Sequence, residues 1–512
     1  MTSISHYRTR IILRASAALI LGVVFVCSWL VYGPHIVDDA YITFRYAWNL
    51  AKGNGLVYNP GIRVQGSSTP LFSLLLGAAG FLGMDIPAAS LVIGAAGSIL
   101  TGFILIFTGI RTGKEEAGWL AAFALHTQLV WILLCVSGME TMLYSAFCLM
   151  TLSAVSLRRW KWTGILAGFS CLVRYDGFLL ALAALAIAWK EAGRKTAFRE
   201  LGKAAALYLP WFIFAWIYFG TPIPQSVKAK TLINVISWKA LPGIYRYYIA
   251  LISLAGVWIG LSIIGNIVLV KKDSSRMVIP FWMILFLWAF IIERRQINFY
   301  PWYLAPLLAP LFFTGAVGMG FLITRLTRFL VTRWGKLRMK QRYVYATLFT
   351  FFSAGIILFH IHDLILKKGI FGADAFHRER KYKRAARILS KHIQAGETVY
   401  VGELGTMGWF LPEAHIIDSA GIVSPEVCEI RKRDRTNLIR EGLAPEEYTD
   451  GSEDVTRMVI RELKPDYITA KERFLFLEEL SETDFFRKRY REIEKKQLKF
   501  LEQRAFERRR NE

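Results

Sequence analysis

Long apolar runs recur along the chain from Ile11 to Leu366, and they constrain its fold more than any other feature. Each run approaches the ~20 residues that a helix needs to cross about 30 Å of hydrocarbon, where lipid offers backbone groups no other partner. We therefore predict a mainly α-helical, multi-pass membrane protein with about eleven crossings. The predicted spans are residues 11–32, 86–110, 117–136, 140–157, 161–175, 178–190, 203–219, 247–270, 277–292, 300–324 and 343–366.

Basic residues between these runs predict the orientation of the chain. They form short clusters, for example in residues 8–14, 158–161 and 325–342. One further apolar run, residues 69–83, has about fifteen residues and several glycines, which is short for a span. If that run does not cross, all the basic clusters lie on one side, and the positive-inside rule makes this side the cytoplasm. The rule favours a cytoplasmic N-terminus and an interfacial helix over residues 69–83; counting that run as a span puts the later clusters outside.

Two regions lie outside the membrane in this topology. The first is a loop over residues 33–85, which is longer than a simple connection requires. The second follows Leu366, where residues 397–401 and 414–418 resemble strands and residues 378–393 and 452–463 resemble helices. We therefore predict a transmembrane domain over residues 1–366 and a small extracytoplasmic α/β domain over residues 367–512.

The formal net charge of +24 raises the question of nucleic acid as a partner. The basic clusters lie between apolar runs, so membrane topology explains them, and we expect a lipid bilayer and no nucleic acid. Four of the five cysteines lie in apolar segments and Cys428 stands alone. This spacing matches neither a disulfide framework nor a metal site.

An acidic pair, Asp38 and Asp39, follows the first predicted span and opens the long loop. From Asp39 onward the spacing is helical, with Tyr41, Phe44 and Trp48 on one face. Acidic residues at a helix start favour its N-terminus, so the structural interpretation is an N-cap and its neighbour. However, an ionisable pair at the mouth of an apolar bundle is costly unless it is used, which favours a functional role.

Further short motifs follow the acidic pair in order through the membrane region. They are Asp38-Asp-Ala-Tyr-Ile42, Gly55-Leu-Val-Tyr-Asn-Pro-Gly61, Gln65-Gly-Ser-Ser-Thr-Pro-Leu-Phe72, Ser137-Gly-Met-Glu-Thr141, Arg174-Tyr-Asp-Gly177, Gly220-Thr-Pro-Ile-Pro224 and Tyr300-Pro-Trp-Tyr-Leu-Ala-Pro306. This pattern resembles the GT-C superfamily of integral-membrane glycosyltransferases, in particular bacterial members related to the mycobacterial terminal arabinofuranosyltransferases. Tyr175 takes the position where that pattern usually has proline.

The resemblance implies a GT-C helix bundle in the bacterial cytoplasmic membrane. It implies a hexosyl- or pentosyltransferase that moves a sugar from a polyprenyl-phosphate donor to a glycan, glycolipid or protein acceptor on the outer face. Such a transfer needs a base for the acceptor hydroxyl proton while the phosphate leaves from the opposite face. The first acidic residue is usually catalytic in the superfamily, so Asp38 is the predicted base. Asp39 then orients it, binds acceptor or caps the helix.

The leaving phosphate needs cationic groups on the same side, and arginine suits it through bidentate binding. The candidates are Arg174, Lys228, Lys230, Arg294 and Arg295. Arg174 is the strongest because it ends a span and because Asp176 is placed to hold it. Alternatively, the two lysines solvate a loop and Arg294 pairs with Glu293.

Glu140 is a second acidic group on the predicted outer side. It is expected to orient acceptor hydroxyls, or to hold a divalent cation (Mg²⁺, Mn²⁺ or Ca²⁺) together with Asp38 or Asp39. No cluster of ligand residues has metal-binding spacing, so the sequence favours the first role.

Two other classes of protein have comparable sequences. A lipid or glycolipid transporter or flippase also has many spans and intramembrane charges. Against it stand the long external loop with its acidic pair and the absence of an internal hydropathy repeat. A non-catalytic assembly protein that retains the fold is the third class.

Overall fold

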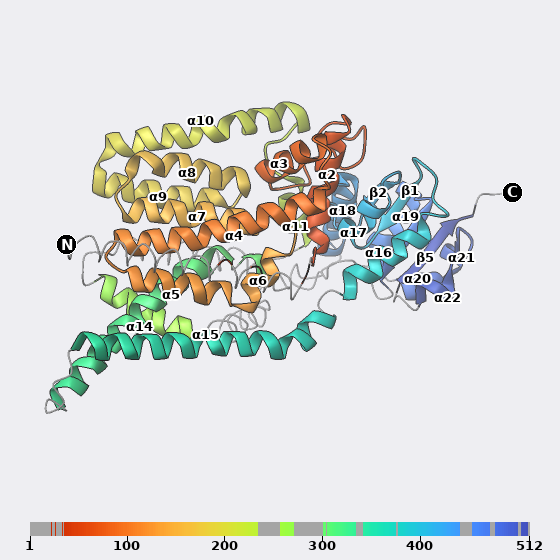
Figure 1. Cartoon of the computed structure of the whole chain (residues 1–512). Coiled ribbons are helices and arrows are strands. Elements are labelled where there is room, and N and C mark those ends of the chain that lie inside the picture. Colours follow the sequence, from red (N-terminus) through yellow and green to blue (C-terminus); the bar gives the residue numbers. More distant parts are fainter. Residues whose placement is uncertain are drawn as a thin grey trace.

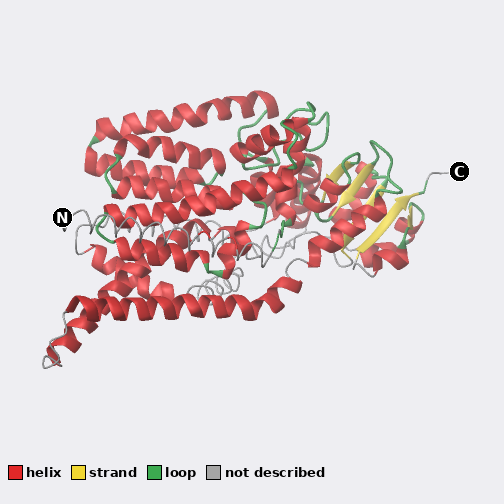
Figure 2. Cartoon of the chain, in the orientation of Figure 1, coloured by secondary structure: helices red, strands yellow, loops and turns green. Residues whose placement is uncertain are grey.

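The computed structural model describes residues 35–233, 256–270, 301–303, 305–333, 341–374, 377–440, 453–471, 477–499 and 503–509, together with Gly22, Val26 and Gly33. Helices dominate these residues, and the strands among them all follow residue 397 (Figure 2). The described part of the chain forms a helical bundle with a smaller mixed α/β segment at one end (Figure 1).

The bundle is built from apolar helices that lie side by side (Figure 1). Its largest core buries Leu105, Trp131 and Phe312 completely. Small residues permit close helix contacts, as expected inside a membrane: a side-chain carbon at Gly97 would lie 2.6 Å from the backbone of Met142. The helices are α4 (Ile86–Arg111), α5 (Glu115–His126), α6 (Leu129–Cys135), α7 (Thr141–Ser156), α8 (Trp160–Val173), α9 (Gly177–Ala192), α10 (Arg194–Phe219), Gly256–Val270, α14 (Ala305–Arg333) and α15 (Gln341–Asp374).

Four of the described helices are long and apolar enough to cross a membrane: α4, α10, α14 and the part of α15 before residue 361. The outer faces of these helices are apolar; Ile217 on α10, for example, is 79% exposed. Lipid is the solvent that suits such a surface, and the chain is a multi-pass membrane protein.

The predicted spans agree with the structure in some regions and differ from it in others. The span predicted at residues 117–136 differs from a straight crossing, because α5 and α6 meet at an angle of 68°. The spans predicted at residues 11–32 and 277–292 fall outside the described residues, apart from Gly22 and Val26. The domain boundary predicted at Leu366 lies inside α15, which runs on to Asp374.

The loop predicted at residues 33–85 contains two helices, α2 (Asp38–Ala51) and α3 (Pro70–Phe81). Proline at the first position of α3 suits a helix start. With 12 residues, α3 is about 18 Å long, which is short of the ~30 Å hydrocarbon thickness. It packs against α2 at the end of the bundle that also contacts the α/β segment (Figure 1).

The α/β segment contains a five-stranded sheet in the order β2-β1-β3-β5-β4. The neighbours β2, β1 and β3 are parallel, whereas β5 is antiparallel to β3 and β4. The elements are α16 (His377–Leu389), β1 (Thr398–Val401), α17 (Leu404–Phe410), β2 (His415–Asp418), α18 (Pro425–Arg440), α19 (Glu453–Leu463), β3 (Tyr467–Lys471), α20 (Leu477–Glu482), α21 (Asp484–Arg487), β4 (Tyr490–Glu492), α22 (Lys495–Lys499) and β5 (Gln503–Arg508).

This segment packs directly on the loop that contains α2. The buried Asn59 side chain accepts the backbone N–H of Ile416 (3.0 Å) and donates to its carbonyl (2.8 Å), so it pairs with edge strand β2. Gln225, at the start of α11 (Gln225–Ile233), donates to the backbone of Gln65 (2.7 Å) and of Gly421 (3.2 Å). Loop and segment therefore form one packed unit, which positions the residues described next.

Candidate functional site

Asp38 begins α2, yet its carboxylate binds a different helix. Its Oδ1 accepts the backbone N–H of Thr406 (2.7 Å) and its Oδ2 that of Gly405 (3.0 Å), both in the first turn of α17. The side chain is buried, with the residue 4% exposed. Val37 is the N-cap of α2 and supplies no capping side chain, so the acidic pair does not cap its own helix in the simple sense. Asp38 caps α17 instead.

Arg45, two turns further along α2, binds the other end of α17. Its Nη2 donates to the carbonyl of Ala414 (2.7 Å), and its Nη1 donates to those of Leu411 (3.2 Å) and Gly408. A helix carries partial positive charge at its N-terminus and partial negative charge at its C-terminus. One helix therefore places an anion and a cation at the two complementary ends of the other, and we call this contact the α2–α17 joint.

Two glycines allow the joint to close. A side-chain carbon at Gly405 would overlap the carbonyl oxygen of Asp38, and one at Gly408 would overlap the hydroxyl of Tyr58. Both positions belong to the glycine-rich segment from Gly402 to Gly408. The structure gives these glycines a packing role, because the backbones approach where no side chain fits.

A second buried charge group, the Arg174 cluster, consists of Glu140, Arg174 and Asp176. Arg174 donates from Nη1 to Glu140 (2.7 Å) and from Nε and Nη2 to the two oxygens of Asp176 (3.0 and 3.2 Å). The ring centroids of Tyr144 and Tyr303 lie 5.4 and 5.1 Å from the guanidinium carbon. Glu140 is 3% exposed, so its charge relies on Arg174.

Backbone pairing brings the two charge groups to the same end of the bundle. The N–H of Val37, just before Asp38, donates to the carbonyl of Ser137 (3.0 Å), three residues before Glu140. Residues that are far apart in sequence, on α2, before α7 and after α8, thus converge. The site roles that the sequence suggests for Asp38, Glu140 and Arg174 stay predictions.

The other predicted site residues lie away from these two charge groups or outside the residues that the structure describes. Asp39 is half-buried in the first turn of α2, and Lys228 is exposed on α11. Lys230 is on the same helix, but its side chain, like all of Arg294 and Arg295, lies outside the described residues. In the described part of the chain, no three His, Cys, Asp or Glu side chains are grouped to hold a metal ion.

The structure adds Glu403, which the sequence reasoning missed, to this end of the molecule. It is the N-cap residue of α17 but makes no capping bond; its Oε1 accepts instead from the hydroxyl of Tyr382 (3.0 Å). The same oxygen lies 4.0 Å from Nη1 of Arg378. Burial, with the carboxylates of Asp38 and Asp39 nearby, raises the pKa of Glu403 to about 7. The available signal was its place directly before a glycine-spaced helix.

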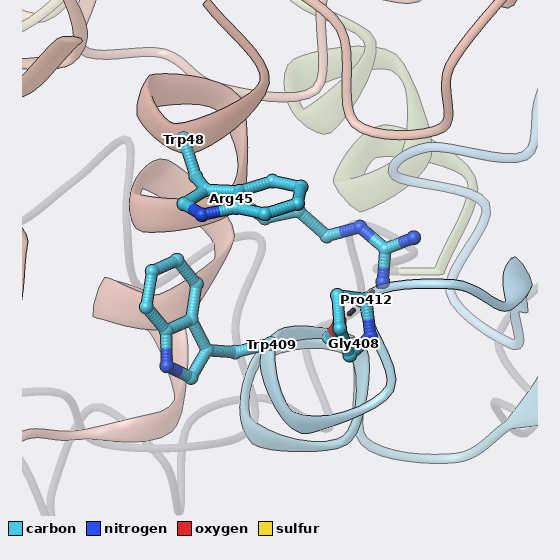
Figure 3. Close-up of a pocket in the computed structure, with 5 residues that line it drawn as sticks. All are labelled: Arg45, Trp48, Gly408, Trp409 and Pro412. Carbon is cyan, nitrogen blue, oxygen red and sulfur yellow. Dashed lines mark hydrogen bonds between the residues drawn. The ribbon is translucent and has the colours of Figure 1, made fainter. Parts of the chain in front are cut away.

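A small pocket lies along the joint (Figure 3). It has a volume of about 210 Å³ and is lined by Arg45, Trp48, Gly408, Trp409 and Pro412. The indole rings come from the two sides of the joint, and the Arg45 guanidinium is directed toward the carbonyl of Gly408. The pocket therefore offers mainly apolar ring surface, with its one cation already bound to backbone carbonyls.

The family match covers the C-terminal segment, whereas the structural matches cover nearly the whole chain. Residues 373–510 match a family described as a domain of unknown function (DUF8728). Among curated proteins, none matches the chain in sequence. The chain is similar in structure to ArnT from Cupriavidus metallidurans bound to undecaprenyl phosphate, with a TM-score of 0.59 and 11% identity over 97% of this chain and 98% of that one.

Two further solved structures extend the likeness. ArnT from the same organism in the apo state has a TM-score of 0.57 and 11% identity, over 93% of this chain and 95% of that one. The Archaeoglobus fulgidus oligosaccharyltransferase tethered to an acceptor peptide has a TM-score of 0.51 and 13% identity, over 97% of this chain and 74% of that one. These neighbours are GT-C glycosyltransferases. The chain has the GT-C fold. Such low identity shows the fold, and the GT-C chain's own chemistry must be argued from its site.

Proposed function

We propose that this GT-C chain is a glycosyltransferase of the bacterial cytoplasmic membrane. It transfers a sugar from a polyprenyl-phosphate donor to an envelope glycan or lipid acceptor on the outer face. In this proposal the end of the bundle with the α2–α17 joint and the C-terminal residues 367–512 are extracytoplasmic, and the N-terminus is cytoplasmic. The relation to mycobacterial arabinofuranosyltransferases belongs to the proposal and rests on the sequence motifs.

One observation carries the proposal: in a GT-C fold, separated motifs bring Asp38, Glu140 and Arg174 to one end of the bundle. Sugar transfer to a hydroxyl needs a carboxylate to take a proton and a cation to receive the leaving phosphate. The end of the bundle at the α2–α17 joint has carboxylates, and the Arg174 cluster has the cation. ArnT, which shares the fold, was solved with undecaprenyl phosphate bound, and this supports a lipid-linked donor.

Arg174 keeps part of its capacity for a phosphate. A guanidinium has five N–H groups, and Glu140 and Asp176 occupy three of those on Arg174. One N–H on each terminal nitrogen remains for a phosphate oxygen. The two carboxylates outweigh the single positive charge, so a dianionic phosphate needs a further cation. Lys228, Lys230, Arg294 and Arg295 remain the predicted sources.

The test is sugar transfer by the full chain in phospholipid nanodiscs. Undecaprenyl phosphate carrying arabinofuranose, mannose or galactose is supplied singly, with delipidated envelope glycan as acceptor, and mass spectrometry follows the product. We expect one donor to be consumed, and Arg174→Lys to raise the donor KM because a point charge replaces a bidentate fork. Intact donors throughout, together with movement of a labelled lipid across liposomes containing the chain, would instead establish a flippase.

The same assay tests the assignment of the base. Asp38→Asn and Asp39→Asn are the two arms that the motif resemblance suggests. Each variant is compared with the wild type for amount of protein and for melting temperature, so that a loss of transfer can be separated from a loss of structure. Full activity in either variant removes that residue from the list of candidate bases.

A further inference from the structure

Glu403 lies at the N-cap position of α17, but its side chain does not cap this helix. An N-cap side chain normally binds the N–H groups of its own helix. Here Asp38 takes the N–H groups of Gly405 and Thr406, so the Glu403 carboxylate is directed elsewhere. Its side chain is 20% exposed, and its Oε2 accepts no hydrogen bond from any residue that the structure describes. This oxygen is available to a hydroxyl from outside the protein.

An independent observation points to a missing donor at the same place. Glu379 is 8% exposed, and its Oε2 is buried with no hydrogen-bond partner among the residues that the structure describes. A buried acceptor without a donor costs about 1–3 kcal/mol, so such atoms usually have a ligand or water partner. Arg378 lies between the two glutamates. Its Nη2 is 3.0 Å from Oε1 of Glu379, and its Nη1 is 4.0 Å from Oε1 of Glu403.

The charges that face Glu403 come from two helices. The carboxylates of Asp38 and Asp39 on α2 favour its protonated form, while Arg378 and the hydroxyl of Tyr382 on α16 favour the ionised form. Burial raises the pKa of Glu403 by more than Arg378 and Tyr382 lower it, so this pKa is about 7. A general base works best when its pKa lies near the working pH.

We propose that Glu403 is the proton acceptor of the transfer reaction and that Glu379, Arg378 and Tyr382 form with it a subsite for a polyhydroxylated, glycan-type acceptor. The inference rests on the proposed glycosyl transfer. In this subsite the acceptor supplies the hydroxyl donors that Glu403 Oε2 and the buried Glu379 Oε2 lack among the described residues. Asp38 is then a positioning residue that holds α17, and with it Glu403, against α2.

The step balances as a single displacement. The acceptor oxygen forms a bond to the anomeric carbon of the donor sugar while its proton moves to Glu403. The bond between that carbon and the phosphate oxygen breaks, and polyprenyl phosphate leaves with the electron pair. Glu403 afterwards releases the proton to solvent, for which its partial exposure gives access.

Glu403→Gln tests the proposal, because an amide keeps the size and the bond from Tyr382 but cannot take the proton. In nanodiscs with the undecaprenyl-phosphate sugar that the wild type uses, we expect kcat to fall about 100-fold or more with little change in donor KM. The wild-type rate should rise with pH through about 7. The matched control is Glu413→Gln, an exposed glutamate of the same segment, which should transfer at the wild-type rate.

A second pair of variants tests the same group without removing it. Tyr382→Phe and Arg378→Gln each delete an influence that lowers the pKa of Glu403. Both variants should therefore move the pH at which the transfer rate rises to a higher value, whatever their effect on the acceptor KM. If Glu403 had only a structural role, these two variants would not shift the pH at which the transfer rate rises.

The outcomes separate this inference from the proposed function. If the wild type transfers sugar and Glu403→Gln does so at a similar rate with an unchanged pH profile, Glu403 is not the base, although the chain is still a transferase. If the wild type transfers no sugar from any donor, the proposed function itself fails. A lost rate together with the shifted pH profiles of Tyr382→Phe and Arg378→Gln supports the assignment.

Discussion

The Arg174 cluster and the α2–α17 joint satisfy buried charge in different ways. In the cluster, one guanidinium lies between two carboxylates, and every contact joins two side chains. In the joint, Asp38 and Arg45 bind only backbone groups of the opposite segment. The cluster therefore depends on the identity of each partner. The joint depends on two charged side chains on one face and on the absence of side chains, at Gly405 and Gly408, on the other.

The largest loss of stability is expected when the central arginine of the cluster is removed. Arg174→Met leaves Glu140 buried and without its cation, because only 3% of that side chain is exposed. Breaking a buried pair by removing one partner costs about 3–5 kcal/mol. Thermal unfolding in detergent should show a large fall in melting temperature, with sugar transfer lost.

The control for this variant is Arg491→Met. Arg491 bonds Glu507 on the surface at 2.8 Å and its side chain is 63% exposed, so water screens the pair and little change in melting temperature is expected. Equal losses in the two variants would mean that burial of the cluster does not set its contribution.

On the joint side, the pH dependence of stability tests the environment of Glu403. Its pKa is about 7 in the folded chain against 4.5 ordinarily, so the unfolded chain loses this proton first as pH rises. The group therefore destabilises the folded state progressively between about pH 4.5 and 7, by roughly 3 kcal/mol at the plateau. Glu403→Gln should gain stability relative to the wild type across this window, measured as the difference in melting temperature. A difference that stays flat from pH 4.5 to 8 would contradict the raised pKa.

The two regions also differ in how far the sequence could predict them. The motifs Ser137–Thr141 and Arg174–Gly177 contain all three side chains of the cluster, and the sequence suggested Asp176 as the partner of Arg174. The ion pair between Arg174 and Glu140 was not predicted. In the joint, Asp38 bonds Gly405 across 367 residues, and one partner is a backbone N–H that every residue but proline has. Such a contact leaves almost no mark in composition or periodicity, and only the spacing of two glycines records it.

The same reasoning applies to the fold. Apolar runs between residues 86 and 219 predicted helices well because hydropathy is a local property. The bend between α5 and α6 lies at the polar residues 126–128 inside an otherwise apolar run, and it was not predicted. Glu403 was missed because its environment depends on how α2, which is distant in sequence, and α16 pack against the helix that follows it.

Gly405→Ala tests the close packing of the joint, because it adds a methyl group there and changes no charge. The added carbon meets the backbone carbonyl of Asp38, which is part of α2 and cannot rotate away. Overpacking of this kind costs about 1–3 kcal/mol. We expect earlier release of the C-terminal segment in limited proteolysis, read by mass spectrometry.

Gly202→Ala is the matched control for that substitution. Gly202 lies in helix α10 with nothing within 4 Å of the added carbon, so alanine should stabilise this helix slightly. If Gly405→Ala also raised stability, the close approach of α17 to α2 would be wrong.

The smallest effect on stability is expected for Asp38→Asn, which nevertheless separates the two views of this residue most directly. Asparagine keeps one acceptor oxygen for α17 and turns the other into an N–H₂ group that opposes the second backbone donor. Loss of one capping bond costs about 1 kcal/mol. Asp85→Asn, at the exposed cap of α4 with a single bond to Ala88, is the matched control and should cost less. If Asp38 is a positioning residue, proteolytic release of the C-terminal segment and the transfer rate should change together and modestly, with the rate falling less than about tenfold. A loss of about 100-fold or more with unchanged proteolysis would instead make Asp38 the proton acceptor, as the motif resemblance predicted, and would remove that role from Glu403.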